Sequence, residues 1–296
     1  MKRILLTALL MIVSLSLCFA QGQVEESQNL SLAVMQGPTG FSSAMIEGVD
    51  LVVYPSPNEA VSRLASGELD MACLPANTAM NLYSKGVKIK ALAVVGEGML
   101  SLVCSGSSPE DKTVYVPGAG GTPDHFAMLF CKDYTIERSV AAPAQLAQMI
   151  IAKKASYALL PEPFVTMILN SSKDAYIVRD MNDDWKALTG QSTYPMSILV
   201  ASEKALQSRP VSVLDAAASY KASVEKVLSD PAQAGKRIEE LGIMKAALAQ
   251  AAIPNCRLVY VGASQAKEQI MSYCDVLLEL APQAIGSKRI DDGFFY

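Results

Sequence analysis

The stretch Thr113–Phe126, TVYVPGAGGTPDHF, predicts an apolar strand, a glycine turn and the start of a helix in immediate succession. Its three glycines can adopt positive φ and let another molecule approach the backbone. Thr122 followed by Pro123 is typical of a helix start, because threonine caps well and proline suits the first helical position. We expect this helix to continue to about Lys132 and its first N–H groups to face a ligand at the end of a strand.

A loop of the same kind comes earlier in the chain. The strand Leu30–Met35 runs into Gln36–Gly40 (QGPTG) and then into the apolar run FSSAMI. Thr39 heads this helix as Thr122 heads the other one. Two copies of one strand–glycine loop–helix unit suggest two lobes that face each other.

Predicted strands alternate with predicted helices, and the alternation repeats with a fixed spacing. Ser56–Glu59 (SPNE) has the pattern of a capping box that opens a helix. Pro57 and Pro75 are 18 residues apart, as are Pro143 and Pro161. The segment ASGELDMACLPANTAMNL is matched in the second unit by AKKASYALLPEPFVTMIL. This alternation favours parallel βαβ units and predicts an α/β fold.

The chain leaves the repeated pattern near Tyr194. A further strand, MSILVAS, follows there, and the long helices Pro210–Leu228 and Ala263–Leu280 come after it without another glycine loop. We infer that the chain leaves the first lobe near Cys104 and returns near Tyr194, so that two crossover segments form a hinge. The predicted lobes are residues 30–104 plus 196–296 (lobe 1) and residues 105–195 (lobe 2).

The start of the chain predicts export. Lys2 and Arg3 precede the apolar run Ile4–Leu17, which is short for a membrane span and typical of a secretory signal peptide over residues 1–20. Residues 21–29 form a polar tether. A competing interpretation is a lipoprotein signal with Cys18 acylated; the bulky Leu17 disfavours it and the tether suits it. Both interpretations place the mature protein in the periplasm or another extracytoplasmic space.

Charge and composition exclude several classes of partner. The formal charge is −4, and loss of Lys2 and Arg3 with the signal peptide takes it to −6, because residues 1–20 contain no acid. A domain with this net negative charge does not attract nucleic acid or anionic lipid electrostatically. No second long apolar run follows, so we expect contact with the membrane only through a permease or a lipid anchor. The 51% of hydrophobic residues can fill the cores of two lobes.

Cysteine and histidine give no sign of a cofactor or a metal site. Cys256 and Cys274 could pair in an oxidising compartment, but buried thiols are the favoured interpretation for the cysteines. His125 is the only histidine, so a site of several histidine ligands is excluded, and we expect a structural or cleft-lining role. A catalytic dyad with Cys131 is disfavoured, because six residues along a helix bring side chains to nearly opposite faces. The run GAGGTP is neither a P-loop nor a full dinucleotide fingerprint.

Longer segments carry a family resemblance. The segments SPNEAVSRLASGELDMACLPANTAMNLYSKGVKIKALAV, VYVPGAGGTPDHF, ALLPEPF and YPMSILV resemble, in order and spacing, periplasmic solute-binding proteins of the nitrate/sulfonate/taurine/thiamine-precursor importer group. The resemblance runs from about Leu30 to Tyr296. It implies a type II, Venus-flytrap periplasmic-binding-protein fold that closes on a small solute and delivers it to an ABC permease with its ATPase. A monomer suffices for this mechanism.

The resemblance also implies which residues line the cleft. The expected ligand-binding residues are Thr39, Gly40, Phe41, Asn77, Thr78, Thr122, Pro123, Asp124, Glu162 and Tyr194. Thr39, Asn77 and Thr122 have an alternative role as helix caps. Glu162 either favours a helix dipole or accepts a hydrogen bond from an amino or amidine-like group. Trp185, with Asp183 and Asp184 before it, indicates a helix start at the surface, with cleft contact as the alternative.

The sequence therefore predicts an extracytoplasmic binding protein without catalytic activity or cofactor. Its solute is expected to be small, polar and nitrogen-bearing, such as a thiamine precursor, or a sulfonate. Two alternatives stay open: a receptor that serves a sensor, and an enzyme on the same scaffold, of the pyrimidine- or menaquinone-pathway type.

Overall fold

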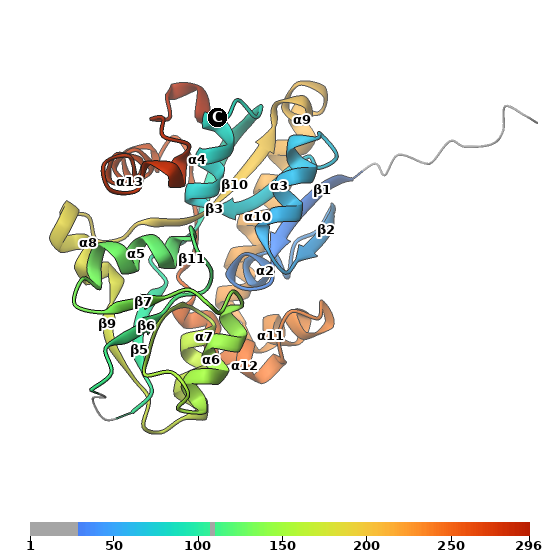
Figure 1. Ribbon diagram of the computed structural model, residues 1–296. Helices are drawn as coiled ribbons and strands as arrows, with labels where there is room; N and C mark the ends of the chain where they lie inside the picture. Colours follow the sequence, from blue (N-terminus) through green and yellow to red (C-terminus); the bar gives the residue numbers. More distant parts are fainter. Residues whose placement is uncertain (1–28, 107–109) are drawn as a thin grey trace, which may run out of the picture.

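The computed structural model describes residues 29–106 and 110–296. The predicted signal peptide with Cys18, and the predicted tether up to residue 28, lie outside the described residues. The described chain is an α/β protein built around two separate sheets, one above the other in Figure 1. No helix in these described ranges is long and apolar enough to cross a membrane.

The first sheet has six strands in the order β11-β4-β10-β3-β1-β2. Its strands are β1 (Leu30–Met35), β2 (Val49–Tyr54), β3 (Met71–Pro75), β4 (Ile89–Glu97), β10 (Pro195–Ser202) and β11 (Leu258–Gly262). β1 pairs in parallel with β2 and β3, as the repeat predicts. β10 is antiparallel to both of its neighbours, because it re-enters this sheet from the other lobe. The sheet is therefore mixed, and the prediction of parallel units holds only for its repeated part.

The second sheet has five strands in the order β7-β6-β8-β5-β9. Its strands are β5 (Leu100–Cys104), β6 (Thr113–Tyr115), β7 (Thr135–Glu137), β8 (Tyr157–Pro161) and β9 (Tyr176–Asp180). β6 is parallel to β7 and β8, whereas β5 is antiparallel to β8 and β9. β5 lies in this sheet although the predicted boundary put it in lobe 1. The first crossing therefore comes before β5.

Helices cover both sheets (Figure 1). Those of the first lobe are α2 (Pro38–Ser42), α3 (Pro57–Ala65), α4 (Ala76–Ser84), α9 (Glu203–Ser208), α10 (Pro210–Ser229), α11 (Pro231–Glu240), α12 (Ala246–Ala252) and α13 (Lys267–Leu280), with the 3-10 turns η1 (Ile253–Asn255), η2 (Pro282–Ile285) and η3 (Asp292–Phe294). Those of the second are α5 (Thr122–Phe130), α6 (Pro143–Ile151), α7 (Phe164–Ser171) and α8 (Met181–Thr189). The sequence analysis missed α11, α12 and β11, which lie between the two predicted long helices.

Several predicted helix caps differ in the structure. Ser56 occupies the N-cap of α3, but its side chain makes no capping hydrogen bond. Gly121 is the N-cap of α5, so that Thr122 is already its first helical residue. α5 ends at Phe130, before the predicted Lys132, because the backbone of Cys131 turns to φ −109° and ψ 42°.

The two crossings of the hinge meet at one side chain. Asn182 Nδ2 at the start of α8 donates a hydrogen bond to the carbonyl oxygen of Gly98, at 2.6 Å. A Cβ atom built on Gly98 would lie 1.9 Å from Asn182 Oδ1 and 2.4 Å from Thr193 Oγ1. Glycine at position 98 therefore lets the outgoing crossing, the returning crossing and α8 pack together.

The five cysteines of the described ranges are buried and unpaired. Cys256 belongs to the hydrophobic cluster that α10 shares with the first sheet, and Cys274 to the cluster around α13 and α4. The disulfide bond between Cys256 and Cys274, which the sequence left open, is therefore not formed. Both cysteines are buried thiols.

Candidate ligand site between the two lobes

The first turns of α4 and α5 meet across the junction of the lobes. Thr122 Oγ1 donates a hydrogen bond to Asn77 Oδ1 at 3.3 Å, and both residues are about 4% exposed. Neither is an N-cap, since Pro75 and Gly121 hold those positions. Two residues predicted from different lobes are thus in direct contact.

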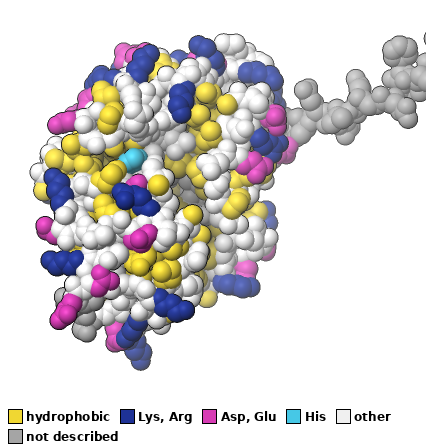
Figure 2. All heavy atoms as spheres, in the orientation of Figure 1, with side chains coloured by type: hydrophobic (Ala, Val, Ile, Leu, Met, Phe, Trp, Pro, Cys, Tyr) yellow, Lys and Arg dark blue, Asp and Glu magenta, His cyan; other side chains and the backbone are white. Residues whose placement is uncertain are grey.

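A pocket of about 310 Å³ opens beside this contact. Its volume is in the range of sites for small molecules. It is lined by Val61, Asn77, Thr78, Asn81, Leu82, Lys85, Gly120, His125, Gln283 and Ala284. The lining therefore comes from α3, α4 and η2 in the first lobe, and from the glycine loop and α5 in the second. Figure 2 views this face, with the histidine (cyan) near the hollow between the two halves of the molecule.

His125 is the most unusual side chain of the pocket. It is 6% exposed, and neither ring nitrogen has a hydrogen-bond partner within the described chain. Burial lowers the pKa of His125, so the neutral imidazole is favoured. A neutral imidazole carries one N–H donor and one nitrogen acceptor, and both nitrogens are buried beneath the surface of the pocket.

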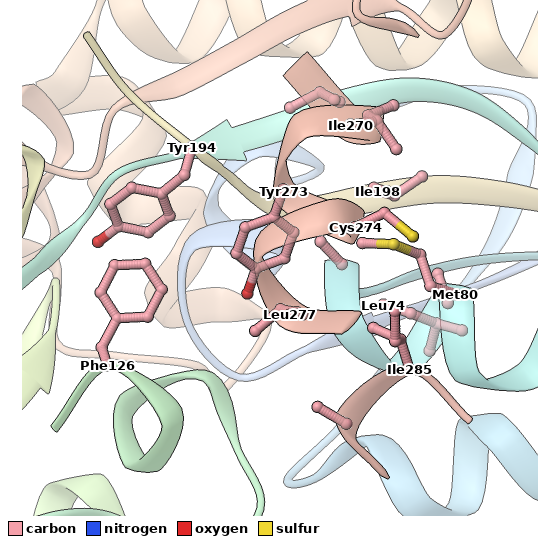
Figure 3. Close-up of a cluster of buried hydrophobic side chains, with 14 of the residues drawn as sticks. Leu74, Met80, Phe126, Tyr194, Ile198, Ile270, Tyr273, Cys274, Leu277 and Ile285 are labelled. Atoms are coloured by element: carbon pink, nitrogen blue, oxygen red, sulfur yellow. The ribbon is translucent and has the colours of Figure 1, made fainter. Parts of the chain in front are cut away.

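Four buried aromatic side chains pack together around Phe126, the residue that follows His125. Phe126 of α5 lies 4.3 Å from Tyr194, between ring centroids, and Trp185 of α8 and Tyr273 of α13 complete the group. Figure 3 shows the rings of Phe126 and Tyr194 facing each other, with Tyr273 projecting from α13 beside them. Trp185 Nε1 and the hydroxyls of Tyr194 and Tyr273 are buried without a hydrogen-bond partner among the described residues. Burial raises the pKa of both tyrosines, so their hydroxyls stay protonated donors.

The glycine loop is organised by Asp124. The carboxylate of Asp124 accepts a hydrogen bond from Gly120 N–H at 2.8 Å and forms an ion pair with Arg138, also at 2.8 Å. The Asp124 side chain is 6% exposed and that of Arg138 is 37% exposed. The N–H group of Gly120 therefore points at a carboxylate of the chain itself.

Glu162 has the same arrangement at α7. Its carboxylate accepts a hydrogen bond from Thr166 N–H in the first turn of that helix, at 3.1 Å. Burial raises the pKa of Glu162, and the Thr166 N–H opposes this shift. Asn255 of η1 reaches the same turn from the first lobe, since its Nδ2 lies 3.0 Å from Thr166 Oγ1. Glu162 therefore lies near the junction of the lobes, and it does not line the pocket.

The three predicted residues on α2 are turned into the first lobe. Phe41 is fully buried in the cluster between the first sheet and α10. Thr39 Oγ1 accepts a hydrogen bond from Met35 N–H at 3.0 Å, so it closes the loop below the helix instead of capping it. A Cβ atom on Gly40 would lie 2.7 Å from the Met35 carbonyl oxygen. The structure does not bring these residues to the pocket.

The structure therefore brings only some of the predicted ligand-binding residues together near the pocket. Asn77, Thr78 and Thr122 meet at the pocket, Pro123 and Asp124 follow in the same turn of α5, and Tyr194 lies against Phe126. The sequence analysis did not select Tyr273 or Gln283, which no local pattern connects with the glycine loop. Trp185 is fully buried, so the prediction of a surface position is wrong.

Comparison with protein families gives a match over most of the chain. The model of a family described as menaquinone biosynthesis matches residues 43–270. The chain belongs to this menaquinone biosynthesis family. No curated protein matches its sequence.

Solved structures similar to this family member include proteins of ABC transport systems and a periplasmic binding protein. An ABC transporter protein from Parabacteroides distasonis is 26% identical, with a TM-score of 0.80 over 91% of this chain and 99% of that one. The periplasmic aliphatic sulphonate binding protein of Escherichia coli is 12% identical, with a TM-score of 0.69 over 92% of each chain. A ligand-binding component of an ABC-type import system from Staphylococcus aureus, with zinc bound, is 15% identical, with a TM-score of 0.69 over 91% of this chain and 97% of that one. The chain therefore has the periplasmic-binding-protein fold.

Proposed function

We propose that this protein is the extracytoplasmic solute-binding component of an ABC-type importer, of the kind that serves nitrate, sulfonates, taurine or thiamine precursors. The observation that carries the proposal is the concentration of unpaired buried polar atoms where the lobes meet: both nitrogens of His125, Trp185 Nε1, and the hydroxyls of Tyr194 and Tyr273. Each buried group without a partner costs about 1–3 kcal/mol. A polar solute held between the lobes could pair with several of them.

Closure would follow from contacts that both lobes contribute. Thr122 bonds Asn77, Asn255 bonds Thr166, and Arg257 pairs with Asp180 at 2.7 Å, each across the junction. A solute that binds the closed arrangement more tightly than an open one shifts the population toward closure. A permease could then recognise the closed form and receive the solute.

The proposal includes no catalytic activity. Cys131 Sγ lies 3.6 Å from an Arg179 guanidinium nitrogen, so the thiol faces Arg179 and not His125. Burial raises the pKa of Cys131, which disfavours the nucleophilic thiolate. These contacts disfavour a catalytic dyad of Cys131 and His125.

A second candidate is an enzyme of menaquinone biosynthesis, which the family match favours. In that case His125 is the residue we expect to move a proton, because it is neutral, buried and unpaired at the pocket. General acid–base catalysis needs such a group within hydrogen-bond reach of the substrate.

Native mass spectrometry on the exported protein, purified without refolding, separates the two candidates. We expect one small molecule, released unchanged on denaturation and able to raise the melting temperature when added back. Recovery of a substrate together with its product, or turnover that His125→Ala abolishes, would establish the enzyme instead. The intact mass of the mature chain also tests how the signal peptide is processed, because cleavage after Ala20 and lipidation of Cys18 give different masses.

A further inference from the structure

His125 lies on the face of α5 that the first lobe covers. Thr122 contacts Asn77 of α4, and His125 follows Thr122 by three residues, a spacing that puts both side chains on one face of a helix. His125 also lines the pocket whose first-lobe wall consists of α3, α4 and η2. The side chain is 6% exposed, at the hollow between the two halves of the molecule in Figure 2. Separation of the lobes would remove part of this cover and let water reach the ring.

The charged form of this ring has no suitable partner where the lobes are in contact. Neither nitrogen has a hydrogen-bond partner among the described residues, whereas an imidazolium has two N–H donors to satisfy. Asp124 already accepts a hydrogen bond from Gly120 N–H and pairs with Arg138. Burial lowers the pKa of His125, although the charge of Asp124 and the nearby backbone of Gly120 oppose this shift. A proton on the ring therefore creates a buried charge that is costly to keep.

The first lobe brings no negative charge to the ring. Lys85 of α4 is the one charged residue that lines the pocket within the described ranges, and it is a cation. α3 and η2 contribute only uncharged side chains to this lining. Tyr273 of α13 lies near Thr122 and stays protonated, because burial raises its pKa. Contact between the lobes therefore opposes a positive charge on His125.

The open and closed forms should consequently bind protons differently. Opening hydrates the ring and returns its pKa towards the usual 6.5, whereas the closed form keeps the pKa lower. The closed form then binds fewer protons, so it becomes less favoured as the pH falls through 6.5. One titrating group can change the ratio of open to closed form by up to about tenfold for each pH unit below that value.

We propose that His125 makes closure of the lobes pH-dependent: its protonation in mildly acidic surroundings favours the open form and weakens the hold on a solute. The inference rests on the movement of the lobes in the proposed binding function and adds a control of that movement. In an extracytoplasmic location, it would couple retention of the solute to the acidity outside the cell.

The single tryptophan can report the opening without a label. Trp185 is fully buried and packs against Tyr194 at the hinge and Tyr273 of the first lobe. The test measures quenching of its fluorescence by acrylamide, an uncharged probe, together with the radius of gyration from X-ray scattering. Between about pH 7.5 and about pH 5, we expect the quenching constant of the native protein to rise by about twofold or more. The radius of gyration should rise with it, reversibly and with an unchanged far-UV circular dichroism spectrum.

Two variants connect the response to its proposed cause. His125→Gln removes the proton site and keeps a neutral polar side chain, so both signals should stay constant over this pH range. Glu162 is a second buried titratable group near the junction, and burial raises its pKa, so its protonation favours the closed form. Glu162→Gln should therefore retain or enlarge the native response. Absence of a response in the native protein, equal responses in native and His125→Gln, or loss of the response in Glu162→Gln alone would overturn the inference.

The titration of His125 can also be read directly from the native protein. It is the only histidine, so its Cε1–H resonance needs no assignment when the protein carries no histidine tag. We expect a titration midpoint below 6.5, and a midpoint at or above this value would overturn the inference even if His125→Gln fails to fold.

Native mass spectrometry distinguishes failure of this inference from failure of the proposed function. One compound released unchanged, from a protein whose lobes do not respond to pH, would overturn the inference and leave the binding function standing. Turnover of the recovered compound would overturn the binding function itself.

Discussion

Helices α2 and α5 follow glycine loops of similar sequence, yet they occupy opposite environments. α2 is five residues long and buries Thr39, Gly40, Phe41 and Ser42 in the first lobe. α5 is nine residues long and carries Thr122 and His125 to the junction of the lobes. The same glycine loop–helix unit is therefore part of the core in the first lobe and part of the candidate site in the second.

The difference comes from what packs against each helix. The hydroxyl of Tyr220 on α10 hydrogen-bonds that of Ser42 at 2.5 Å, and Ser223 Oγ donates to the Ser42 carbonyl oxygen at 2.6 Å. α10 thus anchors α2 inside its own lobe. α5 instead meets Asn77 and Tyr194, which lie on the first lobe and at the hinge. Long-range packing assigns the role, and the loop sequence alone does not.

The largest expected effects come from the two buried phenylalanines. Phe41→Ala and Phe126→Ala each remove a fully buried ring, so each should lower the free energy of unfolding by about 3–5 kcal/mol in urea titrations. Phe126→Ala alone should also raise the radius of gyration measured by X-ray scattering, because its ring packs against Tyr194 at the hinge. A larger radius of gyration in Phe41→Ala, with no increase in Phe126→Ala, would contradict the assignment of α2 to the core and of α5 to the junction of the lobes.

The loop glycines give a second, smaller contrast. A Cβ on Gly40 would lie 2.7 Å from the Met35 carbonyl oxygen and 2.9 Å from Ile243 Cδ1, whereas on Gly121 the nearest atom lies at 3.6 Å. Gly40→Ala should therefore destabilise the protein by about 1–3 kcal/mol, as overpacking does. Gly121→Ala is its matched control and should change the stability little. Equal stability of the two variants would show that the α2 loop adapts to the added methyl group.

The pH dependence of stability is a smaller effect that isolates His125. Because burial lowers the pKa of His125 below 6.5, the unfolded chain binds its proton first, and stability should fall as the pH drops below 6.5. The raised pKa of Glu162 acts in the opposite direction at lower pH, so the measurement is the difference between the native protein and His125→Gln. His125 is the only histidine, and the variant should lose less stability between neutral pH and pH 5. Parallel pH profiles for the two proteins would contradict the burial argument.

The smallest expected effect concerns the ion pair across the lobes. Arg257 and Asp180 keep 45% and 35% of their side-chain surface exposed. Arg257→Met should therefore change stability by about 1 kcal/mol or less, and high salt should remove the difference. Arg237→Met on the outer face of α11, which breaks the exposed pair with Glu240, is the matched control. A larger, salt-resistant loss in Arg257→Met alone would identify this pair as a main support of closure.

The fold was predictable where strands and helices alternate in a repeated pattern. The spacing of Pro57–Pro75 and Pro143–Pro161 gave β3 and β8 correctly, because each strand ends at its proline. Strand direction after the crossings was not predictable, since the antiparallel entry of β10 depends on the path through the other lobe. α11, α12 and β11 were missed because their short segments lack the glycine loop on which the repeat was based.

The site was predictable only to the extent that it lies on these loops. Asn77, Thr78 and Thr122 were expected from the family resemblance; Asn77 and Thr78 line the pocket, and Thr122 contacts Asn77 beside it. Tyr273 could not be found, because its position depends on how α13 packs against the other lobe. Asp124 was expected to face the ligand, but its partners Gly120 and Arg138 are set by the path of the loop.

The buried state of the cysteines has a practical consequence for spectroscopy. Because Cys73, Cys104, Cys131, Cys256 and Cys274 are inaccessible in the folded chain, a maleimide dye should leave them unmodified. Cysteines introduced at the exposed Met128 on α5 and Leu228 on α10 would then carry the label alone. Energy transfer between such dyes would report the separation of the two lobes in solution, one molecule at a time.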